Sequence, residues 1–289
     1  SDVCSSDLKI MFKVDRDICI ACEQCIKDCP VNDIYLKEGK AHIKNEACIK
    51  CGHCIAICPV KAVSTDDYDM SEVIEYKKED FQIEPERLLN FIKFRRSVRR
   101  FKDKEVEKEK IEKIIEAGRF APTSTNSQDV SYTVLQKELP KIKALTYEIL
   151  NKKGQYILEN MNDNIKHLER YANLWTKMYE AHKLDPKAND RLFLNAPLAI
   201  VISAKTPLDG GLASANMELM VDSLGLGTYF NGFFQVAAQD NEELLNLLNI
   251  PKEKQLISCL VIGYPNVSYK RTVPREKADI TWSDRKSVV

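Results

Sequence analysis

The sequence predicts an α+β protein in which a small cysteine-rich domain precedes a larger α/β sandwich, a mixed sheet flanked by helices. Three observations lead to this prediction. A cysteine pattern occurs twice within residues 19–58, a polar and acidic stretch follows it, and apolar segments with helical and strand periodicity then alternate to the end. With 289 residues, 44% of them hydrophobic, the chain is long enough for a small domain and a larger core.

Composition excludes several classes of partner. Lys plus Arg equals Asp plus Glu at 43 each, so we expect neither a nucleic-acid nor an anionic membrane partner. No apolar run approaches the roughly 18 residues needed to cross a bilayer, and the chain lacks a signal-peptide pattern, so we expect a cytoplasmic protein. Eight of the ten cysteines lie within residues 19–58, which in a reducing compartment indicates metal ligands rather than disulfides.

Both ends of the chain look foreign to the rest. The stretches "SDVCSSDL" and "DRKSVV" can each be written as an in-frame translation of sequencing-adapter DNA. We therefore expect residues 1–10 to be a non-native leader and residues 284–289 a non-native tail, which would make Met11 the native start and Cys4 a foreign residue. Ordinary frayed ends are the alternative, and they leave the fold prediction unchanged.

The cysteine repeat comes first in the chain. "CIACEQCIKDCP" at 19–30 and "CIKCGHCIAICP" at 48–59 share the spacing C-x-x-C-x-x-C-x-x-x-C-P, which is typical of bacterial 4Fe-4S ligation. Three closely spaced thiolates can reach one cluster, while the fourth reaches its neighbour. The expected ligand sets are therefore crossed: Cys19, Cys22, Cys25 and Cys58 for one cluster, and Cys48, Cys51, Cys54 and Cys29 for the other.

Zinc is the alternative metal, because zinc sites also use C-x-x-C pairs. Two identical runs of four cysteines, each followed by proline, exceed what a zinc ribbon requires. Residues 11–65 thus resemble a bacterial two-cluster ferredoxin, and residues 33–47 fit a hairpin that turns at Gly39. His53 lies among the ligands, but the cysteine set is complete without it, so we expect a surface histidine. Residues 66–86 then read as a linker.

The larger domain begins with helical periodicity at Leu88, Leu89 and Ile92, followed by "FRRSVRRF" at 94–101. A neutral chain gives little support to a nucleic-acid patch there. Next come an amphipathic helix with Val106, Ile111, Ile114 and Ile115 inward, the loop "APTSTNSQ" at 121–128 and the strand "SYTVLQ". Later segments are the strand "LNAPLAIVISA", the helix and Gly-rich loop of "GLASANMELMVDSLGLGTYFNGFF", and the strand "LISCLVIGYP".

Taken in this order, these segments resemble the nitroreductase family of flavin enzymes. The resemblance implies a nitroreductase-like FMN domain over residues 87–283, behind the ferredoxin-like 4Fe-4S domain. It also implies a homodimer, since in this family the loop corresponding to Asn126 comes from the partner subunit. Asp129 and Val130 depart from the family, where a Pro-Trp pair often follows that loop.

The same resemblance implies the flavin ligands. Arg95, Ser97 and Arg275 hold the FMN phosphate, a dianion suited to the forked guanidinium group, and Arg96 shares their motif. Arg99 faces the N1/O2 side of the ring, where a cation favours the reduced flavin.

Further flavin contacts come from two loops. Asn126 can donate to and accept from the pyrimidine edge of the flavin, and Ser124 and Gln128 share its loop. Asn231 and Gly232 match the place where backbone passes close to N5. The alternative for each loop residue is a plain turn former.

A long helical stretch before Leu194 has Tyr156, Ile157, Met161, Leu168, Tyr171, Ala172 and Trp175 mostly at helical spacing. We expect most of these to be core, although Tyr171, Trp175 and Tyr179 are also candidate walls of the flavin pocket. Cys259, within an apolar strand, is expected to be an inert core thiol. No catalytic side chain is required, because the flavin carries the chemistry.

The functional prediction is an FMN-dependent oxidoreductase that receives electrons through two 4Fe-4S clusters. A donor such as reduced ferredoxin would supply them, and a small conjugated acceptor such as a nitroaromatic or quinone would take them. One alternative is a metabolite dehydrogenase that passes electrons outward to ferredoxin, and another is a non-catalytic redox sensor. Cluster potentials vary too widely for the sequence to choose a direction. The absence of G-x-G-x-x-G favours protein donors, while the substrate and direct reaction with NAD(P)H stay open.

Overall fold

The computed structural model describes residues 11–283, so the suspected foreign leader and tail lie outside the described residues. The chain divides into two compact units. The first takes the residues up to Gln82 together with Thr123–Gln128, and the second takes Ile83–Pro122 and the residues from Asp129 onward. None of the described helices is long and apolar enough to cross a membrane.

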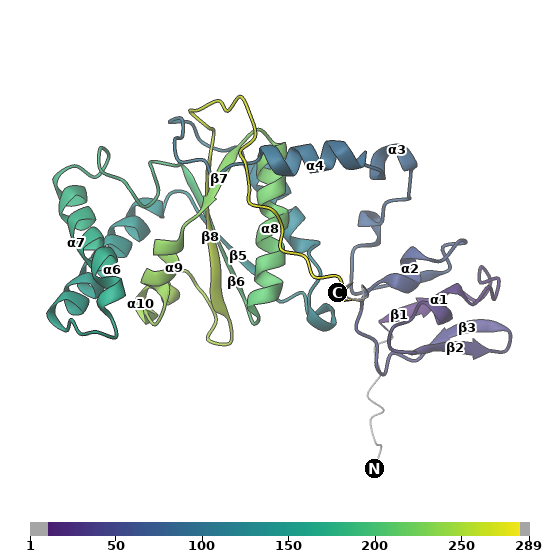
Figure 1. Cartoon of the computed structure of the whole chain (residues 1–289). Coiled ribbons are helices and arrows are strands. Elements are labelled where there is room, and N and C mark those ends of the chain that lie inside the picture. Colours follow the sequence, from purple (N-terminus) through teal and green to yellow (C-terminus); the bar gives the residue numbers. More distant parts are fainter. Residues whose placement is uncertain (1–10, 284–289) are drawn as a thin grey trace, which may run out of the picture. The chain divides into compact units, whose positions relative to one another are not determined.

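The first unit is built from short elements. Strand β1 (Phe12–Val14) pairs antiparallel with β4 (Val63–Thr65), and β2 (Ile34–Lys37) pairs antiparallel with β3 (Lys40–Ile43). Gly39 turns the second pair at φ 70°, which confirms the predicted hairpin. Helices α1 (Gln24–Lys27) and α2 (His53–Ala56) follow the two cysteine loops, and η1 (Met70–Glu72) and α3 (Lys78–Phe81) follow β4 (Figure 1).

The second unit contains a four-stranded sheet with the order β5-β6-β8-β7 and antiparallel pairing throughout. One parallel bridge, Ser97 to Thr228, adds the arginine-rich segment beside β7. The α+β fold class predicted from the sequence is confirmed. The strands are β5 (Ser131–Leu135), β6 (Leu198–Ala204), β7 (Gly227–Phe230) and β8 (Gln255–Gly263). The helices are α4 (Pro85–Phe94), α5 (Lys108–Arg119), α6 (Leu139–Glu159), α7 (Glu169–Leu184), α8 (Pro207–Ser223), α9 (Gly232–Ala238) and α10 (Glu242–Leu247), with the short turn η3 (Lys166–Leu168) before α7.

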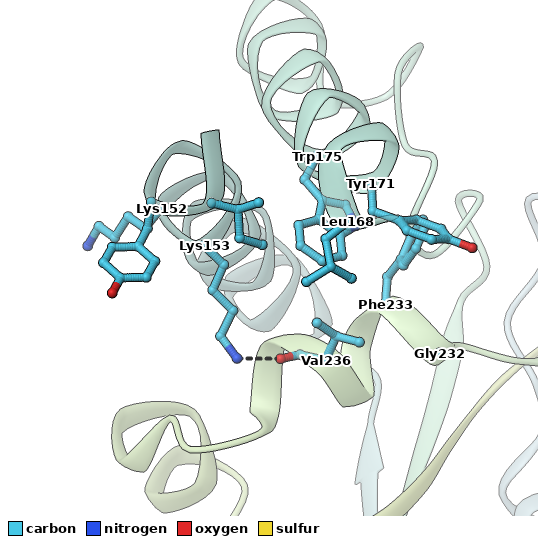
Figure 2. Close-up of a pocket in the computed structure, with 10 residues that line it drawn as sticks. Lys152, Lys153, Leu168, Tyr171, Trp175, Gly232, Phe233 and Val236 are labelled. Atoms are coloured by element: carbon cyan, nitrogen blue, oxygen red, sulfur yellow. Dashed lines mark hydrogen bonds between the residues drawn. The ribbon is translucent and has the colours of Figure 1, made fainter. Parts of the chain in front are cut away.

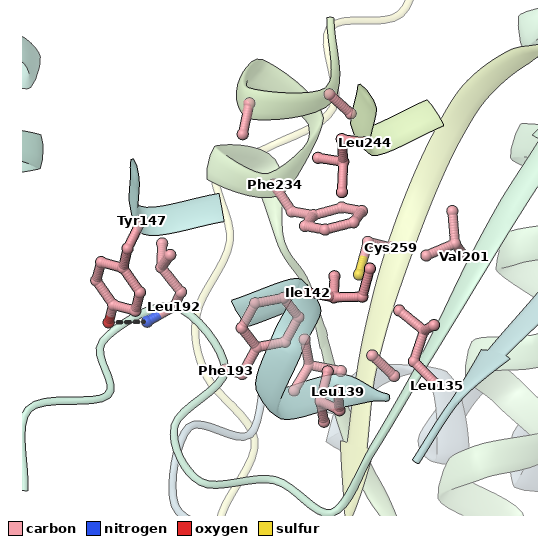
Figure 3. Close-up of a cluster of buried hydrophobic side chains, with 14 of the residues drawn as sticks. Leu135, Leu139, Ile142, Tyr147, Leu192, Phe193, Val201, Phe234, Leu244 and Cys259 are labelled. Atoms are coloured by element: carbon pink, nitrogen blue, oxygen red, sulfur yellow. Dashed lines mark hydrogen bonds between the residues drawn. The ribbon is translucent and has the colours of Figure 1, made fainter. Parts of the chain in front are cut away.

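Both faces of this sheet are covered. Ile200 and Ile202 of β6 lie in the cluster formed with α5 and α8. Val106, just before α5, and Ile111 and Ile114 within it are buried in this cluster, as predicted. Val201 lies on the opposite face, in a cluster formed with α6, α7, α9 and α10 (Figures 1 and 3). Alternating residues of a central strand thus fill two separate apolar layers.

The core on the α6 side contains the buried thiol of Cys259, as predicted (Figure 3). Complete burial raises the pKa of this thiol, which keeps it protonated. Nearby, the hydroxyl of Tyr147 accepts hydrogen bonds from the backbone N–H groups of Arg191 and Leu192 at 2.8 and 3.2 Å. The loop that leads into β6 is therefore fixed to α6.

Two glycines bring the arginine-rich segment beside the sheet. Helix α8 ends at Ser223, and the chain then turns at Gly225, which adopts φ 71°, while the N–H of Leu226 bonds back to the carbonyl of Val221 at 3.1 Å. A Cβ on Gly227 would lie 2.5 Å from Cγ2 of Val98. The absence of a side chain at this position therefore lets the segment around Val98 lie directly on the start of β7.

The expectation that most apolar residues of α6 and α7 form core does not hold for Tyr156, and Tyr171, which was also a candidate pocket wall, is not core either. Ala172 and Trp175 are buried, but Tyr156 is 67% exposed and Tyr171 is 46% exposed. Helical spacing places side chains on one stripe, but the stripe on these two helices is wider than the surface they bury between them. The extra apolar surface lines a cavity described below.

Candidate functional site

The eight clustered cysteines surround two hollows in the first unit. The hollow lined by Cys19, Cys22 and Cys25 also contains Cys58. The hollow lined by Cys48, Cys51 and Cys54 also contains Cys29. Each set takes its fourth sulfur from the other run, which is the grouping that crossed ligation requires.

A repeated backbone conformation produces this grouping. Residues 29 positions apart take the same left-handed φ: 56° at Ala21 and Lys50, 60° and 74° at Glu23 and Gly52, and 53° and 58° at Asn32 and Lys61. Left-handed residues reverse the local direction of the chain, so the cysteines around them can face a common centre. All of these except Gly52 carry a side chain, and such conformations persist only where the surroundings hold them.

The sulfur atoms have surroundings that suit thiolates bound to iron. The N–H of Asp33 donates to Sγ of Cys29 at 3.3 Å, and the N–H of Ala62 donates to Sγ of Cys58 at 3.2 Å. Burial, with the neighbouring Cys48 and Cys51 adding to it, raises the pKa of Cys54 to about 12. Four crowded thiolates therefore need nearby positive charge, which the irons of a 4Fe-4S cluster would supply, so the donor sets fit that group.

The loop that resembles a flavin-binding segment belongs to the first unit. Thr123–Gln128 includes the turn η2 (Ser124–Asn126), and Nδ2 of Asn126 donates to the carbonyls of Ile49 and Lys50, both at 3.0 Å. Nε2 of Gln128 donates to the hydroxyl of Tyr68 at 2.7 Å. Ser124 begins the turn. Hydrogen bonds therefore hold this loop against the backbone between Cys48 and Cys51.

The arginine-rich segment lies in the second unit and lines a hollow of about 270 Å³ together with Phe94, Asp222 and Tyr269. Arg95 forms an ion pair with Glu218. Nε of Arg95, and Nε and Nη2 of Arg96, are buried donors that have no partner within the described part of the chain. Unpaired guanidinium N–H groups beside a hollow fit an anionic ligand such as a phosphate.

The sequence reasoning missed two acidic residues of α8, Asp222, which lines this hollow, and Glu218, which pairs with Arg95. Glu218 and Asp222 lie one helical turn apart. Burial raises the pKa of Asp222 to about 7, with the Glu218 charge adding to the rise and Arg95 opposing it. Their four-residue spacing places both on one face of the helix, but nothing in the sequence indicated that this face is buried.

Other predicted flavin residues lie elsewhere. Arg99 is exposed, and its guanidinium carbon lies 5.9 Å from the ring centre of Tyr229. Ser97 is held through its backbone bridge to Thr228. Arg275 lies on the exposed, irregular stretch that follows β8.

Asn231 is buried, and both ends of its amide are engaged. Nδ2 donates to the carbonyl of Leu192 at 2.9 Å, while Oδ1 accepts from the N–H of Phe234 at 3.1 Å. Asn231 thereby caps α9 at its N-terminus and fixes the position of Gly232, the first residue of that helix.

Gly232 borders a cavity of about 790 Å³ between α6, α7 and α9 (Figure 2). The lining is almost entirely apolar and consists of Lys152, Lys153, Tyr156, Ile157, Leu168, Tyr171, Trp175, Gly232, Phe233 and Val236. Tyr171, Trp175 and Phe233 form an aromatic group with ring centroids 5.9 to 6.2 Å apart. Two of the predicted pocket walls, Tyr171 and Trp175, are thus at a cavity, whereas Tyr179 packs against the adjoining core.

Lys153 closes one side of this cavity. Its Nζ donates to the carbonyl of Val236 at 2.6 Å (Figure 2) and to that of Gln239 at 2.9 Å, at the C-terminal end of α9. Burial lowers its pKa. Leu168 and Phe233 also line the cavity but were not identified as pocket residues, because their apolar character gave no signal distinct from that of core residues.

Comparison with known proteins agrees with this architecture. Residues 92–264, more than half of the chain, match the nitroreductase family, and residues 11–59 match a 4Fe-4S dicluster domain. An "FMN reductase [NAD(P)H]" from Bacillus subtilis is 29% identical over 171 residues, which cover 59% of this chain and 62% of the relative. An "NADPH-dependent oxidoreductase" from Staphylococcus epidermidis is 28% identical, with 59% of this chain and 61% of the relative covered.

Among solved structures, a BluB-like flavoprotein from Clostridium difficile has the same fold. It aligns with a TM-score of 0.51 and 24% identity, covering 68% of this chain and 96% of its own. The two sequence relatives named above are each covered over less than two thirds of their length. The family match and the cysteine geometry together show that this chain belongs to the nitroreductase family and carries an N-terminal 4Fe-4S dicluster domain.

Proposed function

We propose that this chain is an FMN-dependent oxidoreductase in which two 4Fe-4S clusters exchange electrons with the flavin, and that it reduces a small conjugated acceptor such as a nitroaromatic or quinone. One observation carries the proposal. Two crossed four-cysteine hollows lie in the same chain as a nitroreductase-family domain with a large aromatic cavity. A domain that stores single electrons is thus fused to a fold that serves two-electron chemistry.

FMN is supported by the names of two similar proteins and by the arginine hollow. One relative is an FMN reductase, and a protein of the same fold is a flavoprotein. Arg95 and Arg96 would hold the phosphate through their unpaired N–H donors. When bound, FMN supplies the two-electron redox chemistry, while Arg99 supplies a positive charge that favours the reduced form.

The acceptor class follows from the cavity beside Gly232. Its lining surface is mostly apolar and includes three aromatic residues that contact one another. Flat conjugated molecules gain both area burial and ring contacts in such a site. We propose reduced ferredoxin as the electron donor, a homodimer as the active assembly and the cytoplasm as the location.

The proposal is tested on anaerobically purified protein. We expect about eight irons and one FMN per chain, because the chain encodes two cubane sites and one flavin site. Reduced ferredoxin should reduce the clusters and then the FMN, and a nitroaromatic or quinone should reoxidise the FMN. Zinc in place of iron, or clusters that stay reduced beside a permanently oxidised FMN, would contradict it.

A further inference from the structure

The internal repeat allows the two cysteine loops to be compared position by position. Ile20 lies between the first two ligands of one run, and Ile49 lies at the same position in the other. Ile20 is 60% exposed and Cys22 is also exposed, whereas Ile49 and Cys51 are half-buried. The two loops share one backbone conformation, yet only the first is open to solvent.

The cover on the second loop comes from two segments of the first unit. Asn126 donates to the carbonyls of both residues between Cys48 and Cys51, and the hydroxyl of Tyr68 donates to one of them, that of Lys50, at 3.1 Å. Gln128 in turn donates to Tyr68. The first loop instead has a lysine contact, from Nζ of Lys40 to the carbonyl of Cys19 at 2.6 Å.

Asn126 lies on a segment that is continuous in the chain with the second unit. Its segment runs directly into β5 of the nitroreductase-family domain, and its amide bonds to the peptide groups that join Cys48 to Cys51. A hydrogen bond to a peptide next to a ligand gives a short through-bond connection to the cluster. The other set of ligands has an exposed cysteine that a carrier protein can approach.

We propose that the cluster held by Cys29, Cys48, Cys51 and Cys54 exchanges electrons directly with the flavin, whereas the cluster held by Cys19, Cys22, Cys25 and Cys58 exchanges them with the external carrier. This inference rests on the proposed function. Each reduced ferredoxin loses one electron to the outer cluster, which passes it to the inner one. After two such transfers, the FMN has gained two electrons and takes up two protons from solvent.

The experiment uses the full chain with both cofactors and compares Cys22→Ser with Cys51→Ser, which occupy the same position in the two runs. Each variant is mixed anaerobically with a reduced bacterial two-cluster ferredoxin. Electron paramagnetic resonance follows the reduced cluster, and visible absorbance follows the flavin. In Cys51→Ser the remaining outer cluster should become reduced while FMN stays oxidised. In Cys22→Ser the first step should slow, but any electron that reaches the inner cluster should pass on to FMN without accumulating.

A second pair of variants keeps all eight cysteines. Asn126→Ala should leave cluster reduction at the parent rate but slow the cluster-to-flavin step at least tenfold, measured with excess FMN so that occupancy is complete. Lys40→Met removes the side-chain contact to the carbonyl of Cys19 in the first loop and should leave that step unchanged. This pair decides the question if either cysteine variant does not fold.

The outcomes separate the two proposals. Reduced cluster that accumulates beside oxidised FMN in Cys22→Ser but not in Cys51→Ser would overturn the order. An equal loss in both cysteine variants, or parent behaviour in Asn126→Ala, would also overturn it. If the parent protein passes no electrons from its clusters to FMN, the proposed function itself fails.

Discussion

The cores of the two units differ in composition. The buried centre of the first unit consists of a few side chains, such as Phe12 and Ile34, around Cys19 and Cys25, which are predicted to bind a cluster. The second unit places complete apolar layers on both faces of a sheet. A small domain whose core contains its metal ligands depends on the metal for stability, whereas a large apolar core does not. One chain therefore combines a metal-dependent fold with a self-sufficient one.

Removal of iron should produce the largest difference between the units. We expect chelation under oxidising conditions to unfold residues 11–65, because the thiolates of each hollow lose the charge that holds them together. The sheet of the second unit should keep its protection. Hydrogen exchange measured by mass spectrometry reports both regions in one sample. Equal loss of protection in β6 and β8 would show that the second unit also depends on the metal.

A cavity created in the core of the second unit should destabilise that unit and leave the first unit unaffected. Ile200 is fully buried in the central strand β6, so Ile200→Ala should lower the free energy of unfolding of this unit by about 2–5 kcal/mol. Urea unfolding of the second unit measures this loss. Iron content should not change, and Val134→Ala, at an exposed position of β5, serves as the control. Loss of iron in Ile200→Ala would show that the two interiors are not independent.

Removing an arginine from the hollow lined by Arg95 and Arg96 should change FMN affinity alone, by an intermediate amount. Arg95→Ala should weaken FMN binding by about 1.5–3 kcal/mol, because a charge-assisted contact to phosphate is removed. Arg100→Ala is the matched control, since Arg100 is exposed in the same run. Fluorescence titration of the apoprotein with FMN measures both. Equal affinities in the two variants would place the phosphate elsewhere.

Asp222 should affect the pH dependence of stability alone. Its folded pKa of about 7 lies above the ordinary value of 3.8, so the folded state binds this proton more tightly than the unfolded state does. The contribution is present at low pH and is lost as the pH rises from about 4 to about 7. Asp222→Asn should therefore make the free energy of unfolding less dependent on pH across this window. Asp103→Asn, at an exposed carboxylate, is the control substitution.

More of the first unit than of the second could be predicted from the sequence, and the reason is physical. Cysteine ligands are fixed by short loops, so spacing alone indicates which sulfurs are neighbours, and the hollows contain those sets. The hairpin at Gly39 and the buried faces of α5 and β6 were also predictable, because each depends on local periodicity. The overall α+β class followed from the order of these segments.

The flavin residues depend instead on contacts between distant segments. Arg95 and Arg96 line one hollow, Gly232 borders another, and Asn126 belongs with the cysteine loops. Their assignment to one cofactor stays a prediction, because local patterns do not determine which distant segments meet. Asp222 was missed for the same reason, since its burial depends on the packing around the arginine segment.

The crossed arrangement of the cysteines also bears on how such a domain could arise. Each run of the 29-residue repeat supplies three sulfurs to one hollow and a single sulfur to the other. A peptide that contained one run alone would therefore leave its cluster one ligand short. Two copies of that peptide, each lending its fourth cysteine to the other, would complete both sites with the same geometry. Gene duplication and fusion of such an intertwined pair would yield this domain without any change in ligand chemistry.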